Sequence, residues 1–370
     1  MGLFLLLVSR LRAVPKSGYG RSMKLVSSIF TVVLYLLILP PAVLTISYRA
    51  YADEGEIIIG GRAASGTAGD IYWNKVKDSI ISQSSGRLNP KLFIRGEIGP
   101  EETLFMRLRR NQMNLLGIST SGVSLIEPAL DILRAPFLFD SIEEVGFVLD
   151  YYLKEPVSDL LLAKDLVMID WMSAGWLNFY ATTPILEPAD MKNKRMRINV
   201  DAAALLFIQE VEADYAQVSF SDVLPSLQTG LIDGGEQSTQ LFVTGGFGEY
   251  APHFTLSRHG FLNAVILANR TWFEGHTAAD QSILRGAIPT DAWYRKFFTT
   301  ENESYLAKAI SDGQIIHELT PSQRQLWRAH TADLPRKIID WSGPSAQRLY
   351  DVIVEGRMSF ARQHMGDASN

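Results

Sequence analysis

The chain has 370 residues, a formal net charge of −5 at neutral pH and no cysteine. Its negative charge argues against nucleic acid as a partner, because nucleic-acid binding needs a positive surface. Without cysteine the chain has no disulfide, no thiolate nucleophile and no cysteine-bound metal. The length suits two domains of about 150 residues each, and a core of that size folds without disulfides.

The first 52 residues have a composition of their own. They contain six Lys or Arg, no Asp or Glu, an apolar run at 29–39 and an Ala-x-Ala sequence that ends at Ala52. This pattern predicts a cleavable secretory signal peptide over residues 1–52, and hence a periplasmic protein. The apolar run is shorter than the ~20 residues that a membrane span needs, although a retained anchor is an alternative. Met23 is an alternative start of the chain.

The next hundred residues alternate between strand and helix patterns. Short apolar runs bounded by glycine predict strands, and apolar residues at helical spacing predict helices between them. Pro100 is expected at the first position of a helix that ends at Asn111 in a left-handed conformation. The predicted elements are strand 56–60, helix 67–84, strand 92–94, a helix from 99 and strand 115–118. This rhythm indicates an α/β fold with a largely parallel sheet.

The second part of the chain repeats this rhythm after an aromatic stretch at 171–180. We place the first crossing between domains at Gly175 and the return crossing in a long apolar strand at 262–268. Ser221 is expected to cap a helix that Gly230 ends. The other predicted elements are strand 194–198, helix 202–211, strand 218–220, helix 222–229, a helical stretch at 278–312 and a helical tail at 321–364.

These crossings define the predicted domains. Lobe I comprises residues 53–175 with about 263–300, and lobe II comprises residues 176–262 with part of the C-terminal helical region. Residues 301–370 are expected to form C-terminal helices that pack across both lobes.

Arg197 is the first candidate for a binding residue. Side chains alternate along a strand, so Met196 and Ile198 share one face while Arg197 and Asn199 share the other. Ligands in open α/β sheets bind at the carboxyl ends of strands, which is where Arg197 lies. A planar guanidinium binds a carboxylate through two parallel hydrogen bonds. The alternative is a solvated face without a ligand.

Several phrases occur in an order that resembles the DctP-type solute-binding proteins of tripartite ATP-independent periplasmic (TRAP) transporters. They are S-G-R-L at 85–88, G-P-E-E at 99–102, A-P-F-L-F at 135–139, D-M-K-N-K-R-M-R-I at 190–198 and Q-T-G-L-I-D-G-G-E at 228–236. The resemblance covers about residues 55–350. It implies a type II periplasmic-binding fold with two α/β lobes, hinge strands and a long helix behind both lobes.

The resemblance also implies a function. A small organic acid would be held by a salt bridge as the lobes close, and then delivered to TRAP membrane permease subunits driven by an ion gradient. We expect a monomer without cofactor or metal. The alternative is a ligand-sensing protein that presents its solute to a receptor kinase. A periplasmic enzyme is a third possibility, but residues 117–122 do not form G-x-S-x-G and no H-x-x-x-H pair occurs.

In lobe II the resemblance places Arg197 on the carboxylate-binding arginine of the family. It makes Gln237 a ligand contact, with a surface turn side chain as the alternative, and Phe220 an aromatic against the ligand, with core packing as the alternative. Glu236 is expected to bond the backbone at its turn. Leu177 stands where sialic-acid binders carry a second arginine, which argues for a smaller or more apolar ligand.

In lobe I the resemblance suggests contacts just beyond two strands. Arg62 follows the first strand, and Ser119 follows the third, where a hydroxyl would meet the far end of the ligand. Trp73 and Trp176 are candidates for the walls of the cleft, although large aromatic residues are more often part of a core.

Overall fold

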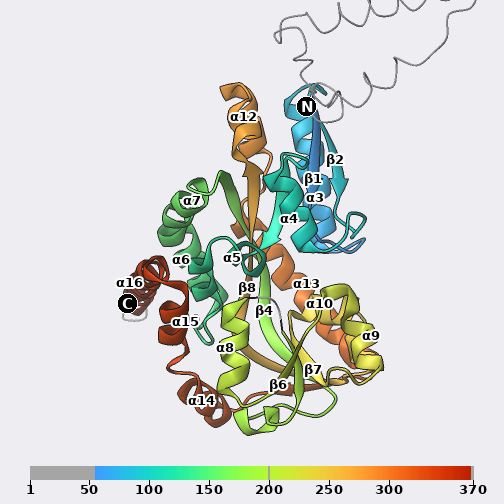
Figure 1. Cartoon of the computed structure of the whole chain (residues 1–370), viewed down its shortest axis with the longest axis vertical. Helices are drawn as coiled ribbons and strands as arrows, with labels where there is room; N and C mark the ends of the chain where they lie inside the picture. Colours follow the sequence, from blue (N-terminus) through green and yellow to red (C-terminus); the bar gives the residue numbers. More distant parts are fainter. Residues whose placement is uncertain (1–54, 199–200, 368–370) are drawn as a thin grey trace, which may run out of the picture. The chain divides into compact units, whose positions relative to one another are not determined.

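The computed structural model describes residues 55–198 and 201–367 of the chain. They belong to one compact unit, Gly55–Asn370, shown in Figure 1. The predicted signal peptide and the candidate binding residue Asn199 lie outside the described residues. Within the described part, no helix combines the length and the apolar composition that crossing a membrane requires.

The described strands form one mixed sheet. Its order is β2-β1-β3-β8-β4-β7-β5-β6, and β9 pairs with β8. The strands are β1 Glu56–Gly60, β2 Asn89–Phe93, β3 Leu115–Ser119, β4 Leu166–Ala181, β5 Arg195–Ile198, β6 Asp214–Gln217, β7 Gly234–Gln237, β8 His253–Asn269 and β9 Ile315–Glu318.

The two long strands β4 and β8 join the two halves of the sheet. They run antiparallel and side by side, pairing with β3 at one end and with β7 and β9 at the other. We call the half built on β1, β2 and β3 lobe I, and the half built on β5, β6, β7 and β9 lobe II. Gly175 pairs with Leu262 in this ladder. The two predicted crossing points therefore lie opposite each other, and the lobe boundaries themselves remain a prediction.

The prediction of a largely parallel sheet holds only within each lobe. In lobe I, β1 pairs with β2 and β3 in parallel, and in lobe II, β5 pairs with β6 and β7 in parallel. The pairs that involve β8 with β3, and β4 with β7 and β8, are antiparallel. The sheet is therefore mixed, because the crossing strands return through it in opposite directions.

Helices cover the strands of each lobe. Between the strands of lobe I lie α3 Ala68–Gln83, α4 Glu101–Arg109, α5 Thr120–Ser124, the 3₁₀ turn η3 Pro128–Arg134, α6 Ile142–Val148, the π turn η4 Leu149–Leu153 and α7 Lys154–Leu162. Lobe II contains η5 Pro188–Met191, α8 Ala202–Glu210, η6 Phe220–Asp222, α9 Val223–Gln228, α10 Thr239–Thr244 and η7 Phe247–Glu249. After β8 come α11 Arg270–Glu274, α12 Ala278–Gly286, α13 Asp291–Ser311, α14 Pro321–His330, α15 Leu334–Ser342 and α16 Pro344–Asp367.

The helical stretch predicted at 278–312 consists of two helices, α12 and α13. Pro289 separates them, since proline cannot donate a helical hydrogen bond, and the side chain of Thr290 caps α13 by accepting from the Trp293 amide. α13 packs against α3 and α6 in lobe I and against α10 and β9 in lobe II. The long helix that contacts both lobes is therefore confirmed, with a shorter range than expected.

Three local predictions were wrong. The strand expected at 218–220 is β6, Asp214–Gln217, which ends level with β5 because Gln217 pairs with Ile198. The chain then turns at Ser219, whose hydroxyl bonds the side chain of Asp222, so Ser221 is not the cap. Pro100 precedes α4 as its N-cap and is not its first residue.

Each lobe has its own core. The core of lobe I includes β1, α3, β3 and the apolar residues of η3. Lobe II has two clusters, one on each face of its strands. The first contains Phe179, Met196 and Phe207, and the second contains Tyr180 and Phe242. The alternation along β4 and β5 thus decides which side chains meet on each face of lobe II.

Candidate functional site

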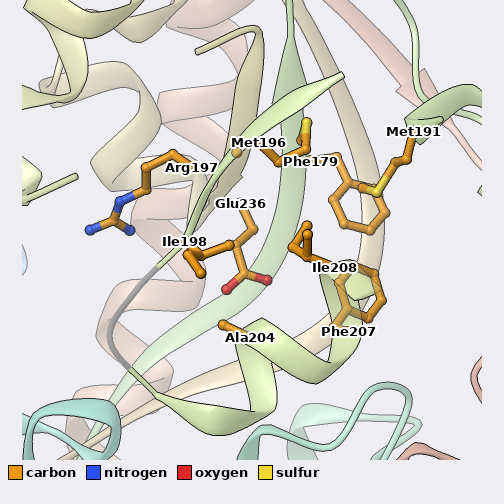
Figure 2. Close-up of a pocket in the computed structure, with 10 residues that line it drawn as sticks. Phe179, Met191, Met196, Arg197, Ile198, Ala204, Phe207, Ile208 and Glu236 are labelled. Carbon is orange, nitrogen blue, oxygen red and sulfur yellow. The ribbon is translucent and has the colours of Figure 1, made fainter. Parts of the chain in front are cut away.

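Arg197 lies near the carboxyl end of β5, on the opposite face from Met196 and Ile198. In Figure 2 its guanidinium points away from the apolar residues that line the other face. Gly235 of the neighbouring strand leaves room for it. A Cβ atom at Gly235 would lie 2.5 Å from the Tyr180 hydroxyl oxygen and 3.2 Å from the Arg197 Cβ. A glycine at this position therefore allows Arg197 and Tyr180 to pack together.

The guanidinium of Arg197 is buried. Arg197 is 7% exposed, and its Nε donates to the Val218 carbonyl oxygen at 3.0 Å. Among the described residues it forms no ion pair, whereas the other buried arginines, Arg134 and Arg295, both pair with carboxylates. Burial lowers the pKa of Arg197. A buried charge is costly unless it is paired, so this group has the capacity to accept an anion.

Gln237 belongs to the same face as Arg197. Met196 pairs with Gly234 across β5 and β7, so Gly235 and Gln237 point to the side of Arg197. The Gln237 side chain is 6% exposed and its Oε1 accepts from the Ser238 amide at 3.0 Å. The surface-turn alternative for Gln237 is therefore excluded.

Phe220 and Arg62 bring the two lobes together beside this face. Phe220 follows β6, two residues after the carbonyl that Arg197 bonds, and its ring packs 5.6 Å from that of Phe247. The guanidinium carbon of Arg62, which follows β1 of lobe I, lies 5.5 Å from the centroid of the Phe220 ring. The structure thus brings Arg197, Gln237, Phe220 and Arg62 to one region, with Arg62 supplied by the other lobe.

The remaining candidates in lobe I have structural partners. The Ser119 hydroxyl donates to Glu101 Oε2 at 2.7 Å and accepts from the Gly122 amide at 3.0 Å, which caps α5. Burial raises the pKa of Glu101. Trp73 is fully buried in the core of lobe I next to Gly117, so it is a core residue and does not form a wall of the cleft.

Trp176 is half-buried near the Gly175 crossing, with its ring 5.1 Å from that of Phe261. It lines a small cavity of about 10 Å³ together with Ser238 and Tyr305. A cavity of this volume holds about one water molecule. Trp176 therefore lies close to the crossing between the lobes.

A second cavity of about 10 Å³ lies in the apolar cluster on the opposite face from the Arg197 guanidinium. Its lining residues are Phe179, Met191, Met196, Arg197, Ile198, Ala204, Phe207, Ile208, Gly235 and Glu236 (Figure 2). It has room for one water molecule and not for an organic acid. It is a gap in the core of lobe II.

A charged network that no sequence pattern predicted lies on that opposite face. Glu236 forms an ion pair with Arg134 of η3, and its Oε2 accepts from His259 Nε2 at 2.8 Å. The other ring nitrogen of His259 lies 2.8 Å from the Ser257 hydroxyl. The expectation that Glu236 bonds the backbone at its turn was therefore wrong, because it bonds two side chains from distant segments.

The surroundings of this network shift the pKa of Glu236 and of His259. Burial alone would raise the pKa of Glu236, but Arg134 and His259 outweigh it and hold that pKa far below its usual value. Burial lowers the pKa of His259, and the ring donates from Nε2 to the Glu236 carboxylate. Across the residues that the structure describes, no three His, Asp or Glu side chains form a group able to hold a metal ion.

Comparison with known proteins identifies relatives over most of the chain. A family model described as "Bacterial extracellular solute-binding protein, family 7", DctP, matches residues 60–340. The C4-dicarboxylate-binding periplasmic protein DctP of Shewanella loihica is 24% identical over 77% of this chain and 86% of its own length. The ectoine-binding periplasmic protein TeaA of Halomonas elongata is 23% identical over 83% of this chain and 91% of its own length.

Solved structures share the fold. The sugar-acid-binding protein DctPAm of Advenella mimigardefordensis, solved in complex with galactonate, has a TM-score of 0.77 at 23% identity and covers 81% of this chain and 98% of its own. The two-lobed α/β architecture described above is therefore that of TRAP periplasmic solute-binding proteins.

Proposed function

Because the chain belongs to the DctP family of bacterial extracellular solute-binding proteins, we propose that it captures a small organic acid through Arg197. It is a binding protein and not an enzyme. Arg197 carries this proposal, since it is a buried guanidinium without an ion-pair partner among the described residues. A ligand carboxylate would supply the missing negative charge through two parallel hydrogen bonds.

Residues near Arg197 support this choice of ligand class. Gln237 shares its face and has an amide that can both donate and accept, which suits a carboxylate or a hydroxyl. Relatives are named for C4-dicarboxylates and ectoine, and a structure with the same fold holds galactonate. Each of these molecules contains a carboxylate group, which is the feature that Arg197 would recognise.

Capture would proceed by closure of the two lobes around the acid. Arg197, Gln237 and Phe220 belong to lobe II, and Arg62 reaches Phe220 from lobe I. A ligand held between both lobes stabilises the closed arrangement and shifts the population toward it. The bulges in β4 and β8, together with the positive φ of Gly175, provide a flexible crossing at which the lobes rotate.

The site of action follows from the family and from the N-terminal sequence. We propose that residues 1–52 direct export and are removed, so that the protein acts as a monomer in the periplasm. The closed, loaded protein would then deliver its acid to TRAP membrane permease subunits. No cofactor is needed, because capture and release require only binding and closure.

A binding screen followed by one substitution tests the proposal. The protein is expected to gain thermal stability with at least one organic acid of a panel that includes succinate, galactonate and ectoine, since a ligand at 100 times Kd adds about 2.7 kcal/mol. Arg197→Met should then weaken binding of that acid by tens to thousands of fold, measured by titration calorimetry.

Arg195→Met is the matched control. Arg195 lies two residues earlier on the same face of β5 but is exposed to solvent, so its loss should leave the affinity unchanged. Equal affinity of Arg197→Met and the wild-type protein would remove Arg197 from the binding site.

A further inference from the structure

Arg134 connects lobe I to lobe II through buried charges. It is the last residue of η3, whose apolar residues belong to the core of lobe I. Its side chain is 3% exposed, pairs with Glu236 of β7, and places its Nε 3.8 Å from Asp201 Oδ1. A single side chain of lobe I therefore reaches two acidic residues of lobe II.

Asp131, three residues earlier in η3, makes a second connection. Its Oδ2 accepts from the amide of Ala202, the first residue of α8, at 3.2 Å. Asp201 precedes this helix and caps it by accepting from the Ala204 amide at 2.9 Å. One short turn of lobe I thus holds the end of β7 and the beginning of α8, which follows β5.

These two attachment points lie close to the proposed ligand contacts. Glu236 is followed directly by Gln237, and Asp201 follows Arg197 by four residues. The Glu236 side chain lies on the opposite face of the strands from the Arg197 guanidinium (Figure 2), so its bond to Arg134 forms away from that guanidinium. Arg134 is therefore placed to fix the strand ends that present Arg197 and Gln237.

The polar groups of this connection are only partly satisfied. Among the described residues, Asp131 Oδ1, Arg134 Nε, Arg134 Nη1 and Asp201 Oδ2 are buried without a hydrogen-bond partner. By contrast, Arg295 pairs with Asp150 and Asp291, and no buried side-chain atom of these three residues lacks a hydrogen-bond partner. Buried polar groups inside one rigid core are normally satisfied. Buried charged groups that lack some of their hydrogen bonds are expected instead at a contact between two lobes, because these groups bind water again when the lobes separate.

We propose that Arg134 is a positioning residue that latches the two lobes, forming its buried bonds to lobe II on closure and releasing them on opening. The inference rests on the proposed function, since the closure in question is closure on the organic acid. The apparent affinity for a ligand falls in proportion to the population of the state that binds it. Substitution of Arg134 should therefore weaken binding although Arg134 does not contact the ligand.

Substitution of Arg134 tests the latch. With the acid of the panel that raises the melting temperature of the wild-type protein most, Arg134→Met should weaken binding by ten to several hundred fold. The loss should appear as faster dissociation in stopped-flow measurements while the association rate changes little, because the latch forms after capture. Arg134→Lys keeps the charge and should retain part of the affinity.

The control is Arg295→Met, which removes a buried paired arginine that contacts lobe I partners only. It should lower stability and leave affinity within about twofold. In the double variant Arg134→Met and Glu236→Gln, the loss should not exceed that of Arg134→Met, because both changes break one interaction. Additive losses, or an unchanged dissociation rate in Arg134→Met, would overturn the latch.

A spectroscopic measurement separates this inference from the proposed function. The chain has no cysteine, so spin labels at Asp78→Cys in α3 and Thr229→Cys after α9 report the distance between the lobes. Arg134→Met should shift this distance toward larger values in the presence of the acid. If no acid binds to either protein, the proposed function fails; if the acid binds and the distance distributions of the two acid-bound proteins are identical, the latch is overturned while the proposed function stands.

Discussion

The two faces of the strands in lobe II treat charge in opposite ways. On one face, Arg197 is buried and forms no ion pair within the described chain, although it bonds the Val218 carbonyl. On the other face, both oxygens of Glu236 are occupied, one by Arg134 and one by His259. Adjacent residues of β5 and β7 therefore contribute to two different kinds of site.

The difference separates binding from stability. Removing one partner of a buried ion pair lowers stability, because the other charge is left buried without a partner. A buried charge whose partner is the ligand lowers the stability of the ligand-free protein, and it is paired only when the ligand binds. We expect loss of the Glu236 carboxylate to lower stability and loss of the Arg197 guanidinium to raise it, and two of the following predictions test this contrast.

The largest effect is expected for Glu236→Leu. It leaves Arg134 buried without its main carboxylate, which costs about 3–5 kcal/mol in free energy of unfolding. Urea denaturation of the protein saturated with its acid measures this loss, because the closed arrangement buries Arg134. A loss below 1 kcal/mol would show that water reaches Arg134 and that the network is not a structural core.

Gly235→Ala is expected to cost about 2 kcal/mol through overpacking. The new methyl group would lie 2.5 Å from the Tyr180 hydroxyl oxygen, so Tyr180 or Arg197 must move. Denaturation should show the loss, and calorimetry should show weaker binding of the acid. Gly230→Ala after α9 is a control at a glycine where a Cβ meets open space, so it changes only the backbone strain.

Asp131→Asn tests the pH dependence of the contact between the lobes. Burial and the nearby Asp201 raise the pKa of Asp131 from 3.8 to about 6. The folded protein therefore holds this proton more tightly than the unfolded chain, and stability falls as pH rises from about 4 to 6. Asparagine keeps an oxygen for the Ala202 amide and carries no charge. The variant should be more stable by about 2 kcal/mol at pH 7.5 and equal to wild type near pH 4.

Arg197→Met should have the smallest effect on stability and the opposite sign. It removes an unpaired buried charge and keeps most of the apolar volume, so the ligand-free protein should gain about 1 kcal/mol. Thermal denaturation without ligand measures this gain. A loss of more than 1 kcal/mol would indicate that Arg197 has a structural partner and is not held for a ligand.

Local sequence patterns predicted many of the elements. Alternation in 194–198 correctly separated Arg197 from Met196, and Asn111 has the expected positive φ. Such features depend on backbone geometry and on neighbours in the chain. The family phrases also identified the fold and the family, because they combine several local features in a fixed order.

Contacts between distant segments could not be predicted from the sequence. Arg134 and Glu236 are separated by 102 residues and His259 follows another 23 later, so no local pattern links them. The strand expected at 218–220 failed because β6 ends where its partner β5 ends.

The sequence by itself determined most of the elements and the face of β5 that carries Arg197, since short-range periodicity specifies these, and the family phrases indicated the two-lobed fold. Only the tertiary structure decided which charges are paired. Pairing depends on the positions of η3, β7 and β8 in the folded protein. The separation of these elements along the sequence does not predict which of their side chains come into contact.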